Sequence, residues 1–209
     1  MKIVLPKLYA IVDVSCFAAA QRTTTAIADY ASELVAGGAT LIQYRNKVGR
    51  AREMLRDARE LRRVLRGNVT LIMNDRADLC LAAAYDGVHI GQDDLSAEGT
   101  RAVVGEARIL GVSTHNLEQL READAGPADY LALGPIFPTA SKQNPDPAVG
   151  LDGLRAARAV TRKPLVAIGG ITRANARSVI EAGADSVAVI ADLFASPRES
   201  AEALLRLLV

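Results

Sequence analysis

Short apolar runs recur along the chain, and each is followed by a segment with helical spacing. The runs contain Val, Ile, Leu and Ala almost without interruption, so they lack the alternation of a strand with one solvated face. Such runs are typical of parallel strands that are covered on both faces. We predict eight strands, at residues 9–13, 40–45, 70–74, 87–91, 108–113, 130–135, 165–169 and 186–190.

The segments between these runs carry the spacing and the end signals of helices. From residue 27 to 35, apolar side chains recur at i, i+3, i+4, i+7 and i+8, and Gly37–Gly38 supplies a left-handed stop. Near the C-terminus, Ser196, Pro197 and Glu199 have the order of a helix start. The arginine-rich helical segment 49–67 is interpreted as a solvated face with internal ion pairs rather than as an RNA-binding surface.

Strand-helix alternation predicts parallel pairing through right-handed crossovers. Eight repeats in 209 residues predict closure into a single (β/α)8 TIM barrel, with a doubly wound open sheet as the alternative. No linker rich in Pro, Ser or Gly divides the sequence. We therefore expect one catalytic domain over residues 1–209.

The balance of charge excludes some partners. With 25 basic and 24 acidic residues the net charge is +1, which does not favour nucleic acid or an anionic membrane. An anionic ligand must therefore be held by a local pocket. Cys16 and Cys80 are too few for a disulfide framework or a zinc site and fit a cytoplasmic setting, and no apolar run approaches the roughly 18 residues of a membrane span.

Polar residues gather at the predicted C-terminal ends of the strands, where parallel barrels place their active sites. Arg45 and Lys47 share one side of an extended segment and can converge on one anion. Asp75 and Asp94 end successive segments, and two carboxylates beside phosphate-binding cations suit Mg2+ that bridges a diphosphate. Each Asp can instead cap the following helix.

Glycines and histidines give weaker signals. Gly169–Gly170 ends the seventh strand just before a helix, which favours a backbone phosphate site, although a glycine pair also serves simply to turn a corner. His89 lies inside a predicted strand and is interpreted as a packed structural histidine. His115 ends a strand and can either move a proton or serve the start of the next helix.

Taken together, the strand-end motifs resemble the thiamine phosphate synthase family. No single block is specific, but their shared order and spacing cover most of the chain from 43 to 190. The matching blocks are QYRNK (43–47), Asn74-Asp75, DGVHIGQDD (86–94), GVSTH (111–115), GPIFPTASK (134–142), AIGGI (167–171) and GADSVAVI (183–190).

The resemblance implies a condensation of hydroxymethylpyrimidine diphosphate with a thiazole phosphate, giving thiamine phosphate and pyrophosphate. It places the pyrimidine diphosphate on Gln43, Tyr44, Arg45, Asn46, Lys47, Asn74, Ser113 and Lys142, of which Arg45, Lys47, Ser113 and Lys142 also take part in catalysis. It places the thiazole phosphate on Thr139, Ala140, Ser141, Gly170, Ile190 and Ala191. Mg2+ would be held by Asp75 and Asp94. Related barrels often form homodimers, but the sequence itself does not determine the oligomeric state.

Two departures from the family pattern and one loop bear on this assignment. Ala191 stands where the family commonly has Ser, and Ser141 stands where it commonly has Thr. The charged groups are retained, so substrate affinity is more affected than activity. The polar loop 141–150, with Lys142 near its start, is expected to close over the site and exclude water.

Two other functions fit the same barrel. In a thiazole tautomerase, His115 would move a proton and no diphosphate site would be needed. A non-catalytic ligand-binding or regulatory barrel would leave gaps in the charged set. The synthase interpretation is favoured because the chain retains Arg45, Lys47, Asp75, Asp94 and Lys142 together.

Overall fold

In the computed structural model of the chain, which describes residues 3–19, 25–139 and 147–209, eight parallel strands close into one barrel. The strands follow one another around the barrel in chain order, and β8 pairs with β1. They are β1 (Leu8–Asp13), β2 (Leu41–Arg45), β3 (Thr70–Asn74), β4 (Gly87–Ile90), β5 (Ile109–Thr114), β6 (Tyr130–Leu133), β7 (Leu165–Ile168) and β8 (Ser186–Val189). The predicted barrel is confirmed, and the open sheet is excluded.

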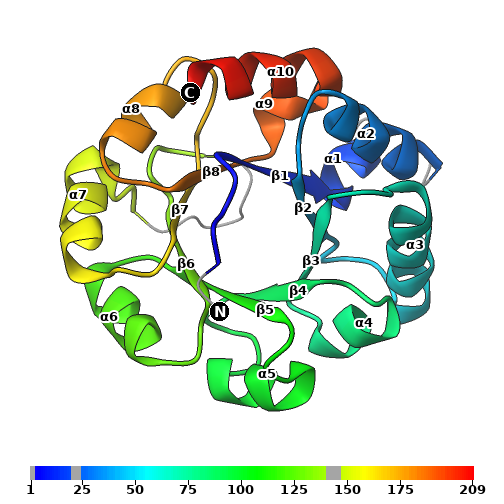
Figure 1. The fold of residues 1–209 in the computed structure, drawn as a ribbon, viewed down its shortest axis with the longest axis horizontal. Helices are drawn as coiled ribbons and strands as arrows, with labels where there is room; N and C mark the ends of the chain where they lie inside the picture. The colour runs from blue at the N-terminus through cyan, green and yellow to red at the C-terminus, as the bar shows by residue number, and fades with distance from the viewer. Residues whose placement is uncertain (1–2, 20–24, 140–146) are drawn as a thin grey trace.

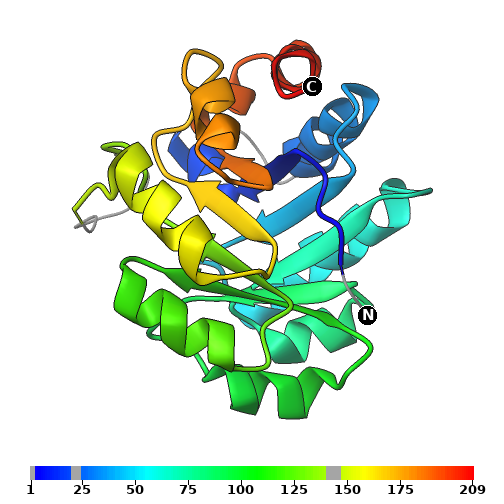
Figure 2. The same cartoon turned by 60° about the vertical axis from the view of Figure 1, so that its left-hand side comes forward.

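Helices form a ring around the strands (Figure 1). They are α1 (Val14–Ala19), α2 (Thr25–Ala36), α3 (Ala51–Val64), α4 (Ala77–Ala82), α5 (Ala97–Val104), α6 (Leu117–Ala125), α7 (Gly150–Val160), α8 (Ala176–Glu181), α9 (Ala191–Phe194) and α10 (Pro197–Leu207). A second view shows α5 and α6 packed outside β5 and β6 (Figure 2). This ring explains the continuous apolar runs, since both faces of every strand are covered.

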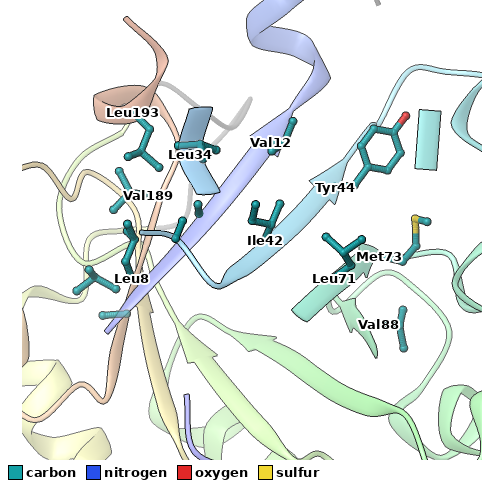
Figure 3. Close-up of a cluster of buried hydrophobic side chains, with 14 of the residues drawn as sticks. Leu8, Val12, Leu34, Ile42, Tyr44, Leu71, Met73, Val88, Val189 and Leu193 are labelled. Atoms are coloured by element: carbon teal, nitrogen blue, oxygen red, sulfur yellow. The ribbon is translucent and has the colours of Figure 1, made fainter. Parts of the chain in front are cut away.

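The apolar side chains form two layers on opposite faces of the strands. The larger layer lies between strands and helices, and Figure 3 shows part of it around Val12, Ile42 and Leu71. The smaller layer fills the barrel interior and includes Ile11, Ile72 and the buried ring of Tyr9. Because side chains alternate along a strand, consecutive residues of β1 belong to different layers.

The helix signals read from the sequence are largely confirmed. Helix α2 ends at Ala36, and Gly38 has a left-handed φ of 96°. A Cβ on Gly37 would lie 2.4 Å from the carbonyl oxygen of Arg198, so the close approach of α2 to α10 requires glycine. Helix α10 begins at Pro197 after Ser196, although the Ser196 side chain makes no capping hydrogen bond.

Helix α3 carries the ion pairs expected of a solvated face. Arg63 binds Glu60 one turn earlier at 2.6 Å, with both side chains exposed. Arg56 binds the buried Asp57, its neighbour in the same helix, at 3.0 Å, and Arg62 reaches beyond the helix to bind Asp86 at 2.8 Å.

The N-terminal rim of the barrel is closed by three similar contacts, which we call the carboxylate clasps. In each clasp, an Asp that precedes an even-numbered strand accepts hydrogen bonds from an arginine and from a backbone N–H of the preceding strand. The clasps are Asp86 with Arg62 and Leu71 N (both 2.8 Å), Asp129 with Arg101 (2.7 Å) and Leu110 N (2.8 Å), and Asp185 with Arg158 and Leu165 N (both 2.8 Å). These charged groups are all engaged in holding neighbouring strands together.

Candidate active site

A cavity of about 500 Å3 opens among the C-terminal ends of the strands. Its wall combines strand ends and the loops that follow them, as expected for a parallel barrel. The sequence-predicted site residues that line the cavity are Gln43, Arg45, Lys47, Asn74, Asp75, Asp94, Ser113, Thr139, Gly170, Ile190 and Ala191. The structure therefore brings together residues that lie up to 148 positions apart in the sequence, from Gln43 to Ala191.

Two residues of the QYRNK motif do not reach the cavity, which corrects the expectation that they contact substrate. Tyr44 alternates with Gln43 and Arg45, so its ring points to the helix layer, where its hydroxyl donates to Asp57 at 3.2 Å. It lies in the same apolar cluster as Ile42 (Figure 3). The side-chain Nδ2 of Asn46 donates to the Tyr44 hydroxyl, and the side-chain Oδ1 of Asn46 accepts from two backbone N–H groups of the loop that follows β2. Asn46 therefore shapes the turn after β2.

Three predicted residues, Ala140, Ser141 and Lys142, lie outside the described residues. The same holds for most of the loop that was expected to close over the site. Their assignment therefore stays a prediction from the family resemblance.

Arg45 is held in place by a carboxylate that the sequence analysis did not identify. Asp13, at the end of β1, is buried and forms an ion pair with Arg45 across the β1–β2 pair. The other oxygen of Asp13 accepts from the backbone N–H and the hydroxyl of Ser15, at 2.9 and 2.7 Å. Arg45 thus reaches the cavity from a fixed base, which preorganises it for an anion.

Lys47, Asp75 and Asp94 form a charged group on the same side of the cavity. The Lys47 ammonium lies 2.5 Å from Asp75 Oδ2. Burial raises the pKa of Asp75, Lys47 opposes that shift, and the adjacent Asp94 carboxyl adds to it. The Lys47 ammonium pairs with Asp75, and Asp94 adds a second carboxylate beside that pair, so one negative charge is left uncompensated and this group attracts a cation.

The backbone at Asp75 is itself unusual, because this residue has a left-handed φ of 63°. Such a conformation costs free energy for a residue other than glycine. It is stabilised by the Asp75 N–H, which donates to the carbonyl oxygen of His89 at 2.7 Å. Asp94 is fixed in turn by the Gly91 N–H, which donates to its Oδ2 at 2.7 Å. The two carboxylates are therefore positioned by separate backbone contacts.

Among the described residues, the Asn74 side chain has no hydrogen-bond partner for its donor group. Its side-chain Nδ2 is buried without a hydrogen bond, although the residue lines the cavity. Buried amide groups are rarely left unpaired, because the lost hydrogen bonds to water are not replaced. An acceptor on a bound ligand would satisfy this group.

Gly169 and Gly170 form the opposite wall. Both have positive φ, at 95° and 65°. A Cβ on Gly169 would lie 2.6 Å from Pro135, and one on Gly170 would lie 2.7 Å from Phe137. The pair therefore serves two purposes that the sequence left as alternatives: it lets the loop after β6 pack closely, and it exposes backbone to the cavity.

Ile190 and Ala191 continue this wall at the end of β8. The adjacent Asp192 accepts from the backbone N–H and the Nε of Arg173, both at 3.0 Å. This pair joins the loop after β7 to the loop after β8. Neither Arg173 nor Asp192 lines the cavity, so this pair joins the two loops from outside the cavity wall.

A hydrogen-bonded chain of buried and partly buried side chains crosses the base of the cavity, and two of its members, Tyr9 and Tyr130, carry no signal in the sequence. Gln43 Nε2 donates to the Tyr9 hydroxyl at 2.8 Å, which lies 2.9 Å from the Tyr130 hydroxyl. The Tyr130 hydroxyl lies 2.9 Å from His89 Nδ1, and His89 Nε2 lies 2.8 Å from Ser113 Oγ. We call these five residues the interior chain.

His89 is buried, as expected of a packed histidine, but it also lines the cavity. Burial lowers its pKa to about 4, so the imidazole is neutral near pH 7. Its ring also stacks on Tyr130, with centroids 5.5 Å apart. The sequence interpretation of His89 as purely structural was therefore incomplete.

His115 supports both of its sequence interpretations in part. Its backbone N–H donates to Gln119 Oε1 at 2.8 Å, and the Gln119 N–H donates to Asn116 at 2.9 Å, which builds the start of α6. Its Nδ1 donates to the carbonyl oxygen of Gly134 at 2.6 Å, and the ring lines the cavity.

These features define a class of protein: a parallel (β/α)8 barrel with a charged cavity at the C-terminal ends of its strands. The comparison with known proteins agrees. The family model described as thiamine monophosphate synthase matches residues 8–193.

Relatives of known name resemble the chain over most of its length. A thiamine-phosphate synthase of Koribacter versatilis is 63% identical over 204 residues, covering 98% of this chain and 96% of the relative. One of Chloroflexus aurantiacus is 47% identical and covers 81% of this chain and 78% of the relative. The solved thiamine phosphate pyrophosphorylase of Pyrococcus furiosus superposes with a TM-score of 0.85 at 34% identity, covering 97% and 95% of the two chains.

The chain belongs to the thiamine monophosphate synthase family. It is accordingly an enzyme, a transferase of the thiamine-phosphate synthase type, and the non-catalytic barrel is excluded. Among the described residues, no helix is long and apolar enough to cross a membrane.

Proposed function

We propose that the chain catalyses the Mg2+-dependent condensation of 4-amino-5-hydroxymethyl-2-methylpyrimidine diphosphate with thiazole phosphate, with release of pyrophosphate. The observation that carries this proposal is the group of Lys47, Asp75 and Asp94, next to Arg45 and across the cavity from the exposed glycine backbone. The names of the relatives support the reaction.

The donor set of this group fits Mg2+. Among the described residues, no cluster of three or more His, Cys, Asp or Glu forms a complete metal cage. Mg2+ instead commonly uses one or two carboxylates together with water and substrate phosphates. Asp75 and Asp94 supply two carboxylates whose mutual repulsion a divalent cation would relieve. When bound, Mg2+ would neutralise charge on the diphosphate and orient it.

Arg45 and Lys47 complete the diphosphate site. The guanidinium offers paired N–H donors to phosphate oxygens, and the ammonium acts as a compact charge. Because Asp13 fixes Arg45, little side-chain freedom is lost when the diphosphate binds. The unpartnered Asn74 amide offers a further donor to the same substrate. By the family resemblance, Lys142 adds a third cation.

Thiazole phosphate fits the wall formed by the loops after β7 and β8. Gly170 exposes its backbone there, next to Ile190 and Ala191, with Thr139 of the β6 loop close by. Glycine lets phosphate oxygens approach backbone N–H groups, as at other barrel phosphate sites. Ala191 has no hydroxyl, so it can contribute only its backbone N–H.

The chemistry requires no protein nucleophile. The bond between the pyrimidine methylene carbon and the diphosphate oxygen breaks, and its electron pair leaves with pyrophosphate. Arg45 and Lys47 stabilise the charge that develops on those oxygens. The aminopyrimidine ring delocalises the resulting cation. The lone pair of the thiazole nitrogen then forms the new C–N bond, while the cavity walls limit access of water to the cation.

The tautomerase alternative depends on His115, whose ring does line the cavity. That reaction would need none of the charges on Lys47, Asp75 and Asp94. We therefore favour the synthase. The two reactions are separable, because only the synthase consumes the pyrimidine diphosphate and depends on a divalent cation.

The test is to incubate the protein with both substrates and Mg2+ and to detect thiamine phosphate and pyrophosphate by mass spectrometry. We expect equal amounts of both products, and neither in excess chelator. Proton exchange on the thiazole in chelator, without thiamine phosphate formation in Mg2+, would instead identify a tautomerase.

A further inference from the structure

The interior chain is not explained by phosphate or metal binding. It joins Gln43 of β2, Tyr9 of β1, Tyr130 of β6, His89 of β4 and Ser113 of β5. Four of these residues are buried, and Ser113 is only partly exposed. A chain of polar groups across a barrel interior is costly unless every donor and acceptor is used. Its cost suggests that it serves the site above it.

Only one arrangement of the hydrogens in the interior chain gives every buried donor an acceptor. The Tyr9 oxygen already accepts from the Gln43 amide, so its own hydrogen is directed to Tyr130. The Tyr130 hydrogen is then directed to His89 Nδ1, which makes Nδ1 an acceptor. A neutral His89 consequently carries its proton on Nε2 and donates it to Ser113 Oγ.

The reverse arrangement is less favourable. If Tyr130 donated to Tyr9, the Tyr9 oxygen would accept two hydrogen bonds, and no partner of Tyr9 in the structure would accept its own hydrogen. That donor would be unpaired on a side chain that is 1% exposed. The direction from Gln43 to Ser113 avoids this loss. It also determines what Ser113 offers to a ligand, because its oxygen has accepted from His89 and its hydrogen remains available.

We propose that His89 is a positioning residue that acts through Ser113, fixing the Ser113 hydroxyl as a hydrogen-bond donor into the cavity, toward a ring nitrogen of the pyrimidine substrate. This inference rests on the proposed function for the identity of the ligand. The backbone of Ser113 is held as well, since Gln92 Nε2 donates to its carbonyl oxygen at 2.6 Å. Both ends of the serine are thus fixed before substrate arrives.

The first experiment is a double-mutant cycle measured as kcat/KM for the pyrimidine diphosphate. Ser113→Ala removes the donor and is expected to lower kcat/KM about tenfold. His89→Asn keeps an amide near the Nδ1 position but cannot reach Ser113, so it should lower kcat/KM almost as much. The double variant should lie within about twofold of Ser113→Ala alone. If the fold-losses in kcat/KM of the two single variants multiply in the double variant, the proposal is overturned.

Two further variants separate positioning from general packing. His89→Gln extends an amide toward the position of Nε2 and should recover most of the activity that His89→Asn loses. Thr100→Val removes a hydrogen bond of another fully buried residue, outside the cavity. It should leave kcat/KM unchanged both in the wild-type protein and in the His89→Asn variant. If His89→Gln were as impaired as His89→Asn while both remained folded, the role of His89 would be structural only.

The unmodified protein provides the last test, which needs no variant to fold. The chain has only two histidines, so the ring nitrogens of His89 and His115 are resolvable in a long-range 1H–15N spectrum of histidine-labelled protein. We expect His89 to be the Nε2–H tautomer, and a proton on Nδ1 would overturn the proposal. This result is independent of turnover: absence of thiamine phosphate formation would contradict the proposed function, whereas the Nδ1–H tautomer in an active enzyme would contradict only the role of His89.

Discussion

The two rims of the barrel use the same charged residue types for different purposes. At the N-terminal rim, each Asp of the carboxylate clasps is shared between an arginine and a strand N–H, as Asp129 is between Arg101 and Leu110. At the C-terminal rim, Lys47 pairs with Asp75, Asp94 lies against that carboxyl, and the Asn74 amide has no partner among the described residues. Charges that are paired within the chain stabilise the fold, whereas charges that are left uncompensated bind ligands.

The largest expected effect comes from neutralising the carboxylates at the C-terminal rim. Asp75→Asn and Asp94→Asn should each lower turnover by a factor of about 100 or more, because a divalent cation contributes several kcal/mol of charge stabilisation. Neither should destabilise the fold, since one of two like charges is removed. Steady-state pyrophosphate release and thermal unfolding check both statements. Normal turnover by both variants would contradict the metal assignment.

Lys142→Ala should have a comparable effect on turnover, by the family resemblance. The sequence predicts a polar loop over residues 141–150, so the loss of this side chain should not affect the barrel core. Pyrophosphate release, measured beside circular dichroism of the folded protein, provides the check. Undiminished release would remove Lys142 from the diphosphate site.

The buried His89 should make stability depend on pH. Its pKa is about 4 in the folded state and about 6.5 when unfolded, so the unfolded chain binds more protons between these values. The unfolding free energy, measured without substrates or Mg2+, should therefore fall as pH is lowered from about 6.5 to 4, by at most about 3 kcal/mol. His89→Asn should remove this component. Denaturant titrations of both proteins across this range test it, and equal slopes would contradict it.

A variant at the N-terminal rim should show the opposite behaviour to the carboxylate variants. Arg101→Met leaves the carbonyl oxygens of Gly105, Arg108 and Pro127 and the Asp129 carboxylate without their donor. We expect a loss of about 2 kcal/mol in unfolding free energy with kcat unchanged at a temperature where the variant is folded.

The matched control for that variant is Arg63→Met, which breaks an exposed ion pair with Glu60 and should leave stability essentially unchanged. A fall in kcat for Arg101→Met at full folding would show that the two rims are not independent.

The smallest expected effect concerns the phosphate wall. Ala191→Ser introduces the hydroxyl that the family resemblance leads us to expect at this position, and one added hydrogen bond of about 1 kcal/mol would lower KM for thiazole phosphate roughly fivefold. The value of kcat should not change. An unchanged KM would show that a hydroxyl at position 191 makes no hydrogen bond to the phosphate.

The fold could be predicted from the sequence because eight strands covered on both faces, each followed by a helix, are compatible with few topologies. It did not show which face of each strand points inward. A strand that is buried on both sides has no alternation to read, so Tyr44 was assigned to the site while Tyr9 and Tyr130 were overlooked. Because side chains alternate along a strand, an inward-facing Arg45 means that its neighbour Tyr44 faces the helices. This alternation would have excluded Tyr44 from the site.

Contacts between segments that are distant in the sequence could not be predicted either. Asp13 ends its strand like the other polar residues, but its role depends on pairing with Arg45 across two strands. The packing of Gly169 against Pro135 depends on how closely the loops after β6 and β7 approach. Such roles are set by the tertiary structure, and no local pattern encodes them.

The most direct test of the central claim is calorimetric titration of the protein with pyrophosphate, with and without Mg2+. The account predicts saturable binding that requires Mg2+, that is lost in the double variant Asp75→Asn/Asp94→Asn and that persists in Arg101→Met. Binding of equal strength without Mg2+, or undiminished binding by the double variant, would contradict it.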